Sequence, residues 1–380
     1  MFRRTALGWH NFRHRWLRTL AALCGIATAI QLLFLQYGLY RGGCQGSVLL
    51  LNQFDYDLAI VPRQYRFIGN SATVDRERIS QVLAVEGVRR SAPFFLGEAR
   101  WLDDLQSVKR EVLVVGVDPA SQPFRMAKAN SLLPQITRPD TALIDRKTGS
   151  GFDNLTVGRS AEFSGRRLDL VDEYKHGIGI LGDAAIIVSD QTFSHLISGS
   201  ETTLTRMTLG FVWLDPGADR STVMRDLRSV LPHDVQVLDR EMHLQIEENF
   251  LMREKPIGVM FITGLWLAIM VGGVILYQIL AVDVENRMPE FATMKALGYS
   301  NWRICSVVWQ QALIFAVAGY LPALASAIFM YHMINTTTTV PAEMDLDAMS
   351  KVLALTVIMA CIAGALSLRK LAKADPADLF

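Results

Sequence analysis

The chain alternates between long apolar runs and stretches of mixed polarity. Neither Thr19–Tyr40 nor Ile257–Val282 contains a charged residue. A helix rises about 1.5 Å per residue, so about 20 apolar residues cross about 30 Å of hydrocarbon. We therefore predict four transmembrane helices, the first of them a retained anchor rather than a cleaved signal peptide. Their predicted bounds are 19–42, 257–282, 304–334 and 352–368, the fourth being short for a span.

About 200 residues separate the first two predicted spans, enough for one or two folded units. Two segments share a strand–helix–strand pattern, one starting with Asp57–Pro62 and the other with Gly210–Pro216. We predict that residues 44–98 and 206–250 form one split α/β lobe. Short strands separated by Gly, Pro and Asp predict an inserted β-rich lobe over 99–205. The predicted fold class is an α+β integral membrane protein with a large extracytoplasmic mixed α/β domain between spans one and two.

The distribution of Lys and Arg predicts the orientation in the membrane. Residues 1–18 contain five arginines and no acid, and their aromatic and basic composition predicts an amphipathic helix at the membrane surface. Basic residues also dominate the tail 369–380, whereas acids dominate the loop 335–351. We therefore expect both termini and the segment 287–300 in the cytoplasm, with residues 43–250 on the outer side.

The sequence lacks the residue patterns that would predict an active site. It has no G-x-x-x-x-G-K-[ST] phosphate loop and no G-x-S-x-G elbow, which argues against a membrane-anchored hydrolase. His10 and His14 share a helical spacing without a neighbouring acid or thiol. Of the four cysteines only Cys44 lies on the outer side, so no disulfide is available there. We predict no catalytic residue, no metal ligand, no cofactor bound by this chain and no nucleic-acid partner.

The spans contain few polar side chains, Gln311 among them, and no buried charge of the kind that a proton-coupled transporter needs. Small residues repeat at helical spacing in the second span, at Gly264, Ala268 and Gly272. Such a row permits close helix packing, within the chain or in a dimer.

The segment 240–256 predicts a helix that leads directly into the second span. It is either a plain connector or a stiff stalk that carries motion between the outer domain and the membrane. His243 lies within it, isolated from the other histidines in the sequence, and we assign it no role.

A short segment of mixed polarity, 287–300, separates the second and third spans. Its pattern predicts a helix that is capped at both ends. Pro289 suits the first turn, and Glu290 and Lys295 match the signs of the helix dipole at its two ends. Gly298 is placed to end the helix with positive φ.

An apolar stripe runs along this predicted helix through Phe291, Met294 and Leu297. A turn between two spans needs only a few polar residues, so one reading is an ordinary connection with no further role. An exposed apolar stripe, by contrast, favours a docking partner.

The motif R-x-x-E-F-A-T-M-K-A-L-G-Y, starting at Arg287, resembles the signature of FtsX/MacB-type ABC transporter permeases. The ending LRKLAKADPADLF resembles the C-terminal motif of that family, and the layout of one span, a large outer domain and three spans is similar. The resemblance is closest to the DevC-like branch. It implies a coupling helix that docks on a separate ATPase. The implied coupling residues are Glu290, Phe291, Met294, Lys295, Leu297 and Gly298.

The resemblance also implies the partners and the location. It implies a homodimer of permeases in the bacterial inner membrane, paired with ABC ATPase subunits that bind ATP and Mg. A membrane fusion protein and a TolC-like outer-membrane channel would complete an exporter of a lipid, glycolipid or similar substrate. Motion of the outer domain, or mechanotransmission, would drive export, and membrane lipids would surround the helices.

Two alternatives share this layout. One is a lipoprotein-releasing permease of the LolC/E kind. The other is a non-transporting, FtsX-like regulator of cell-wall hydrolases, although those proteins have a smaller outer domain. The neighbouring genes would discriminate among them, because an adaptor with a long hairpin favours export and a second permease favours lipoprotein release.

Overall fold

The structure is a computed structural model that describes residues 16–70, 72–103, 108–149, 151–197, 205–337, 341 and 344–373. The chain divides into two compact units. The helical unit comprises residues 1–41, 260–334 and 342–380, and the sheet unit comprises residues 42–259 and 335–341. Most of the amphipathic helix predicted over 1–18, and the end of the tail from residue 374, lie outside the described residues.

Within the described residues, four helices are long and apolar enough to span a membrane, which makes this a multi-pass membrane protein. They are α2 (Trp16–Ser47), α10 (Pro256–Asn286), α12 (Asn301–Thr337) and α13 (Leu346–Lys373). The fourth span is longer than predicted, because the helix starts at Leu346 instead of residue 352. The charges of Asp347 and Lys351 predict that this first turn lies outside the span. In the structure the two side chains form an i,i+4 ion pair along the helix, with 2.8 Å between Nζ and Oδ2.

The helical unit is held together by close packing and by polar contacts, two of which join α2 to the later helices. Tyr331 of α12 donates a hydrogen bond to the carbonyl oxygen of Phe34 in α2 at 2.5 Å. Gly38 permits this approach, because a Cβ there would lie 2.1 Å from the tyrosine oxygen. Arg41 forms a two-pronged ion pair with Asp345, whose second hydrogen bond measures 2.6 Å.

The sheet unit is built around one nine-stranded sheet with the order β11-β1-β10-β3-β4-β8-β5-β7-β6. Its strands are β1 (Leu58–Pro62), β3 (Val88–Asp103), β4 (Val108–Val117), β5 (Thr141–Asp145), β6 (Ser160–Phe163), β7 (Arg166–Tyr174), β8 (Ala185–Ser189), β10 (Leu209–Leu214) and β11 (Val235–Asp239). A second, two-stranded sheet pairs β2 (Val74–Asp75) with β9 (Arg206–Met207).

The strands from the two ends of the unit pair with each other. β1 lies between β10 and β11, and β10 in turn pairs with β3, all antiparallel. Helix α4 (Arg78–Leu83) connects β1 to β3 through β2, and α8 (Arg220–Val230) connects β10 to β11. This order is that of a ferredoxin-like split βαβ arrangement. The segment 99–205 extends the same sheet, and the boundary predicted at residue 98 falls inside β3, which pairs with β4 from Phe94 to Asp103.

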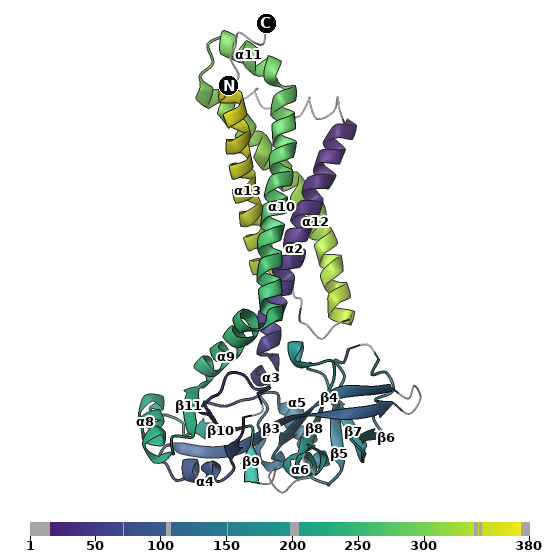
Figure 1. The fold of residues 1–380 in the computed structure, drawn as a ribbon, viewed down its shortest axis with the longest axis vertical. Helices are drawn as coiled ribbons and strands as arrows, with labels where there is room; N and C mark the ends of the chain where they lie inside the picture. The colour runs from purple at the N-terminus through teal and green to yellow at the C-terminus, as the bar shows by residue number, and fades with distance from the viewer. Residues whose placement is uncertain are drawn as a thin grey trace. The chain divides into compact units, whose positions relative to one another are not determined.

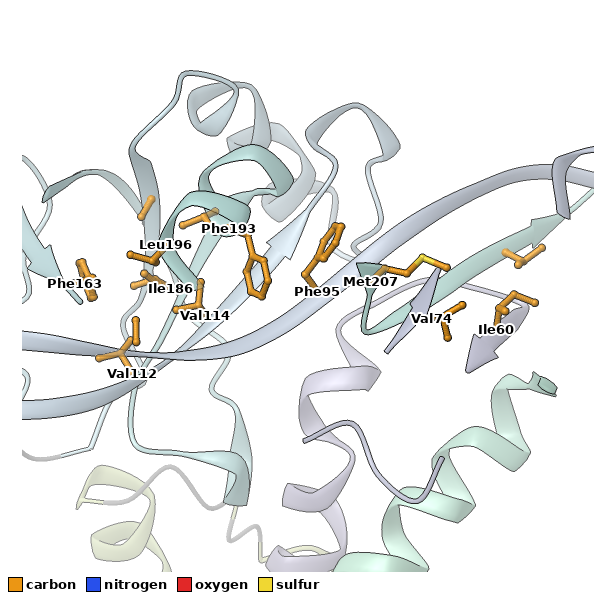
Figure 2. Packing of buried hydrophobic residues seen from close by; sticks show 14 of the residues in the cluster. Ile60, Val74, Phe95, Val112, Val114, Phe163, Ile186, Phe193, Leu196 and Met207 are labelled. Carbon is orange, nitrogen blue, oxygen red and sulfur yellow. The ribbon is translucent and has the colours of Figure 1, made fainter. Parts of the chain in front are cut away.

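Each face of the sheet has its own hydrophobic core, because alternate residues of a strand point to opposite faces. In β1, Leu58 and Ile60 belong to one core and Ala59 and Val61 to the other. The first core is covered by α4, α8 and α6 (Asp190–Ile197). Figure 2 shows Phe193 and Leu196 of α6 directed at this face of the sheet.

Short helices cover the second face or connect the strands. They are α3 (Leu49–Asn52), η1 (Pro119–Ser121), α5 (Ala127–Leu132), η2 (Leu133–Ile136) and η3 (Gly179–Leu181). After β11 the chain forms α9 (Arg240–Asn249), then one π-helical turn, η4 (Phe250–Glu254), and then enters α10. Asp239 caps α9 by accepting the N–H of Met242 at 2.7 Å.

Candidate functional site

The helix between the second and third spans is α11 (Met288–Ala296), and hydrogen bonds define both of its ends. The carbonyl oxygen of Arg287 accepts the N–H of Phe291 at 3.0 Å. At the other end Gly298 donates to Lys295 at 3.0 Å, and Tyr299 donates to Met294 at 3.1 Å. This pair of bonds, with φ of +82° at Gly298, is a Schellman motif. A side chain at Gly298 would meet open space, so only the positive φ requires glycine there.

The apolar stripe of α11 does not form one exposed surface. Phe291 is only 4% exposed and packs with Val284, Ile304 and Val308, and Met294 and Leu368 lie against the same cluster. The expectation of an exposed docking face is therefore wrong for Phe291. Helical periodicity identifies an apolar face but not its neighbour, and here the ends of α10 and α12 cover it.

A polar joint lies beside this cluster and connects three helices. Gln311 of α12 donates to Asp283 Oδ2 of α10 at 2.5 Å. Arg287 Nε lies 3.2 Å from the same oxygen, and its backbone precedes the first turn of α11. The Asp283 and Arg287 side chains are about three-quarters buried. Asp283 is the first charged residue after the charge-free run of the second span, and this position is a signal in the sequence for a polar contact there. The sequence does not reveal Gln311 as its partner.

The exposed residues of α11 and of the turn that follows it form a different surface. Glu290 and Lys295 are exposed, and Leu297 is 72% exposed. Trp302, at the start of α12, is 84% exposed and was not among the predicted residues. We refer to Glu290, Lys295, Leu297 and Trp302 as the distal surface. Figure 1 shows α11 at the end of the helical unit where α2 begins and α13 ends.

The predicted row of small residues in α10 lies inside the helical unit. A Cβ on Gly264 would lie 2.5 Å from Oε1 of Gln36 in α2. A Cβ on Gly272 would lie 2.7 Å from the terminal methyl group of Met359 in α13, and Ala268 is buried. The row therefore provides close packing between helices of one chain.

The chain is similar to known proteins in two respects. Residues 262–376 match the family model of the FtsX-like permease C-terminal domain. The structure is similar to the periplasmic region of MacB from Actinobacillus actinomycetemcomitans, with 11% identity and a TM-score of 0.37 over 53% of this chain and 96% of that chain. It is also similar to the extracellular domain of the noncanonic ABC-type transporter YknZ from Gram-positive bacteria, with 11% identity and a TM-score of 0.33 over 48% and 98%. No curated protein sequence matches the chain.

Proposed function

We propose that this FtsX/MacB-type ABC transporter permease, with its FtsX-like domain over residues 262–376, couples ATP hydrolysis by a separate ATPase to motion of its sheet unit. One observation carries the proposal. Helix α11 is fixed by the Phe291 cluster, while Leu297, just after its last turn, and Trp302, at the start of α12, are exposed. A helix that packs firmly against its own chain on one side, with exposed apolar residues beside it, is suited to transmit a push from a docking partner.

The joint at Asp283 determines how a push on α11 would travel. Arg287 and Gln311 connect the start of α11 to α10 and α12, so these helices would move together. Helix α10 continues without interruption back to Pro256, where it follows η4 and α9 of the sheet unit. The segment 240–256 is thus one of the covalent connections between the two units, as is the continuous helix α2, and its helical structure favours the hypothesis of a stalk over that of a plain connector.

The resemblance to FtsX/MacB-type permeases supports the proposed partners. The ATPase would bind ATP and Mg and would contact the distal surface. This surface and both termini of the permease would lie on the cytoplasmic side. Two permeases would work as a homodimer on two ATPases in a bacterial inner membrane, with the sheet unit outside. A membrane fusion protein and a TolC-like channel would then export a lipid, glycolipid or similar substrate, as in the DevC-like branch. A LolC/E-like lipoprotein-releasing permease and an FtsX-like regulator are the alternatives.

The test is a pair of truncations on the distal surface, Leu297→Ala and Trp302→Ala, in the full chain reconstituted in lipid nanodiscs. The probe is an ABC ATPase subunit from the same organism that co-purifies with the wild-type chain. Loss of an anchor at a protein interface typically costs about 2 kcal/mol, or about thirtyfold in affinity. We expect each variant to weaken ATPase binding by that amount and to lose stimulated ATP hydrolysis, while its own thermal unfolding stays unchanged.

Leu346→Ala is the matched control, because Leu346 is also a largely exposed leucine, 83% exposed, at the start of another helix of the unit. It should leave ATPase affinity unaltered. Full affinity in both distal variants would reject this docking surface, and Trp302 would then be an aromatic residue at the membrane interface.

A further inference from the structure

A hydrogen-bonded chain of four titratable side chains lies buried between α9 and the strand β1. His243 and Glu247, one helical turn apart on α9, are both 0% exposed. Tyr56 lies 2.9 Å from Nδ1 of His243, and Tyr65 lies 2.7 Å from Nε2, each distance measured from the hydroxyl oxygen. Tyr65 also donates a short hydrogen bond to Oε1 of Glu247. The second carboxyl oxygen, Oε2, is buried without a partner.

The number of protons on these four side chains limits the possible directions of their hydrogen bonds. Tyr65 has one proton, so when it donates to Glu247 its oxygen must accept from Nε2–H of His243. Nδ1 of His243 then accepts the hydroxyl proton of Tyr56. If Glu247 instead donates from Oε1, every bond in the chain reverses its direction. Both arrangements satisfy the imidazole, but only a protonated Glu247 leaves the cluster without a buried charge.

The charges around the cluster do not compensate an anion at Glu247. The nearest cation on α9 is Arg240, whose guanidinium lies 5.5 Å from the Tyr56 ring centre and donates to Asn52 at 2.9 Å. Among the described residues no cation forms an ion pair with Glu247. The other charged groups of the packed elements are Asp55 and Arg125 near Tyr56, and Arg66, Glu254 and Lys255 around the neighbouring aromatic stack.

The loop after β1, residues 63–70, holds α9 and η4 through this cluster and through a second contact. Phe67 stacks on Phe250 of η4 with ring centres 4.7 Å apart. Lys255 places its Nζ 5.1 Å from the Phe67 ring centre and 5.2 Å from that of Phe250. The stack is solvent-facing, since Arg66 and Glu254 beside it are more than half exposed. Glu247 is therefore the innermost contact between this loop and the helix.

We propose that Glu247, Tyr65, His243 and Tyr56 form a proton-binding site that latches α9 to the 63–70 loop only while Glu247 carries its proton. The proton passes to water when the loop opens at alkaline pH, the hydrogen bonds of Tyr65 to His243 and Glu247 break, and no other covalent bond changes. The carboxylate that remains can regain hydration only if the loop and α9 separate. This site lies just before the π-helical turn that leads into α10, a type of helix defect that is frequent at functional sites.

The electrostatics agree with this geometry. Burial raises the pKa of Glu247 to about 8, although the hydrogen bond from Tyr65 and the nearby backbone N–H of Ile68 act to lower it. Burial, assisted by Arg240, lowers the pKa of His243 to about 3. Near neutral pH the chain of four groups is therefore uncharged. Because the latch is a property of the sheet unit, its test does not depend on the proposed transport function.

The test is hydrogen exchange of the full chain in nanodiscs, followed by mass spectrometry from about pH 6.5 to about pH 9.5 and corrected for intrinsic exchange. The pKa of Glu247 is about 8 in the closed site and near 4.5 once the site is open to water, so one released proton makes the opening equilibrium rise about tenfold per pH unit up to about pH 8 and level off above it. We expect this rise in peptides covering 63–70 and 243–255 but not in β4 or β10. In Glu247→Gln it should be absent, whereas Glu248→Gln, a change at the exposed neighbour, should behave like the wild type.

A second variant and a direct probe keep the proposal testable if Glu247→Gln folds poorly. Tyr65→Phe keeps the ring but removes a hydrogen bond that lowers the pKa of Glu247 in the closed site, so the rise in opening should continue to a higher pH before it levels off. Infrared spectra at neutral pH should show a protonated carboxyl band that disappears on alkaline titration and is missing from Glu247→Gln. The latch is overturned if that band is absent from the wild type, or if β4 and β10 open together with α9.

Discussion

Two buried carboxyl groups, Glu247 of α9 and Asp283 near the end of α10, are held in opposite ways. Upstream, Glu247 is completely buried among uncharged partners, and one of its oxygens has no partner. Downstream, Asp283 is about three-quarters buried and contacts both a cation and an amide, Arg287 and Gln311. A buried acid without a cation is stable only as a neutral group, whereas an ion pair is stable as two charges. The upstream joint therefore depends on a proton and the downstream joint on a charge pair.

The largest effect that would sharpen this contrast is the pH dependence of folding stability in the sheet unit. The pKa of Glu247 rises from 4.5 to about 8 on folding, so stability is fully present below pH 4.5 and is lost as pH rises to about 8. The pKa of His243 falls from 6.5 to about 3, so its contribution is lost as pH falls below 6.5. Each unit of pH changes stability by about 1.4 kcal/mol per group.

Between pH 4.5 and 6.5 both groups affect stability, in opposite directions. Glu247 lowers the stability as pH rises and His243 increases it, so the stability should be nearly constant there. Above pH 6.5 the wild type should lose stability toward about pH 8, and Glu247→Gln should not. At alkaline pH the variant should thus unfold at a higher temperature than the wild type, by calorimetry of the full chain. Parallel alkaline limbs in the two proteins would contradict the contrast.

The next effect concerns the apolar part of the downstream joint. Phe291→Ala should destabilise the helical unit by about 3 to 4 kcal/mol, because it leaves a cavity among Val284, Ile304 and Val308. Leu297→Ala is the matched comparison on the same segment. It should change stability by less than about 0.5 kcal/mol, since Leu297 is exposed. Chemical denaturation in detergent measures both, and equal losses would show that the two faces of α11 are not distinct.

The smallest effect is the energy of the ion pair itself. A double-mutant cycle of Asp283→Ala and Arg287→Ala should give a coupling of about 1 kcal/mol, modest because the pair retains some contact with solvent. The same denaturation measurement provides it. A coupling near zero would mean that Gln311 alone holds the carboxylate, and the joint would then depend on a hydrogen bond rather than on charge.

Much of the fold follows from sequence periodicity, and the functional contacts largely do not. The four apolar runs, the strands around Asp57–Pro62 and Gly210–Pro216, and the glycine that ends α11 each have a local signal. The fourth span starts earlier than its apolar run predicts, and its charged first turn contains an i,i+4 ion pair. Contacts between distant segments have no such signal. The sequence therefore predicts an exposed Phe291, whereas the structure buries it against α10 and α12.

The buried site on α9 shows the same limit. His243 and Glu247 have the spacing of one helical turn, but Tyr56 and Tyr65 lie more than 170 residues earlier in the chain. Two polar residues on an otherwise ordinary helix are usually exposed. Only the order of the strands, which places β1 beside β11, brings the tyrosines to this helix.

The position of β1 in the sheet also has a consequence for how the protein is made. Both neighbours of β1, β10 and β11, are synthesised about 150 residues or more after it. At about 5 to 20 residues per second, β1 waits roughly ten seconds or longer as an unpaired apolar strand. Pairing across such a sequence separation is intrinsically slow and leaves strand edges open to wrong partners. The pairing of β1 on both of its edges therefore cannot be complete until residue 239 has been synthesised.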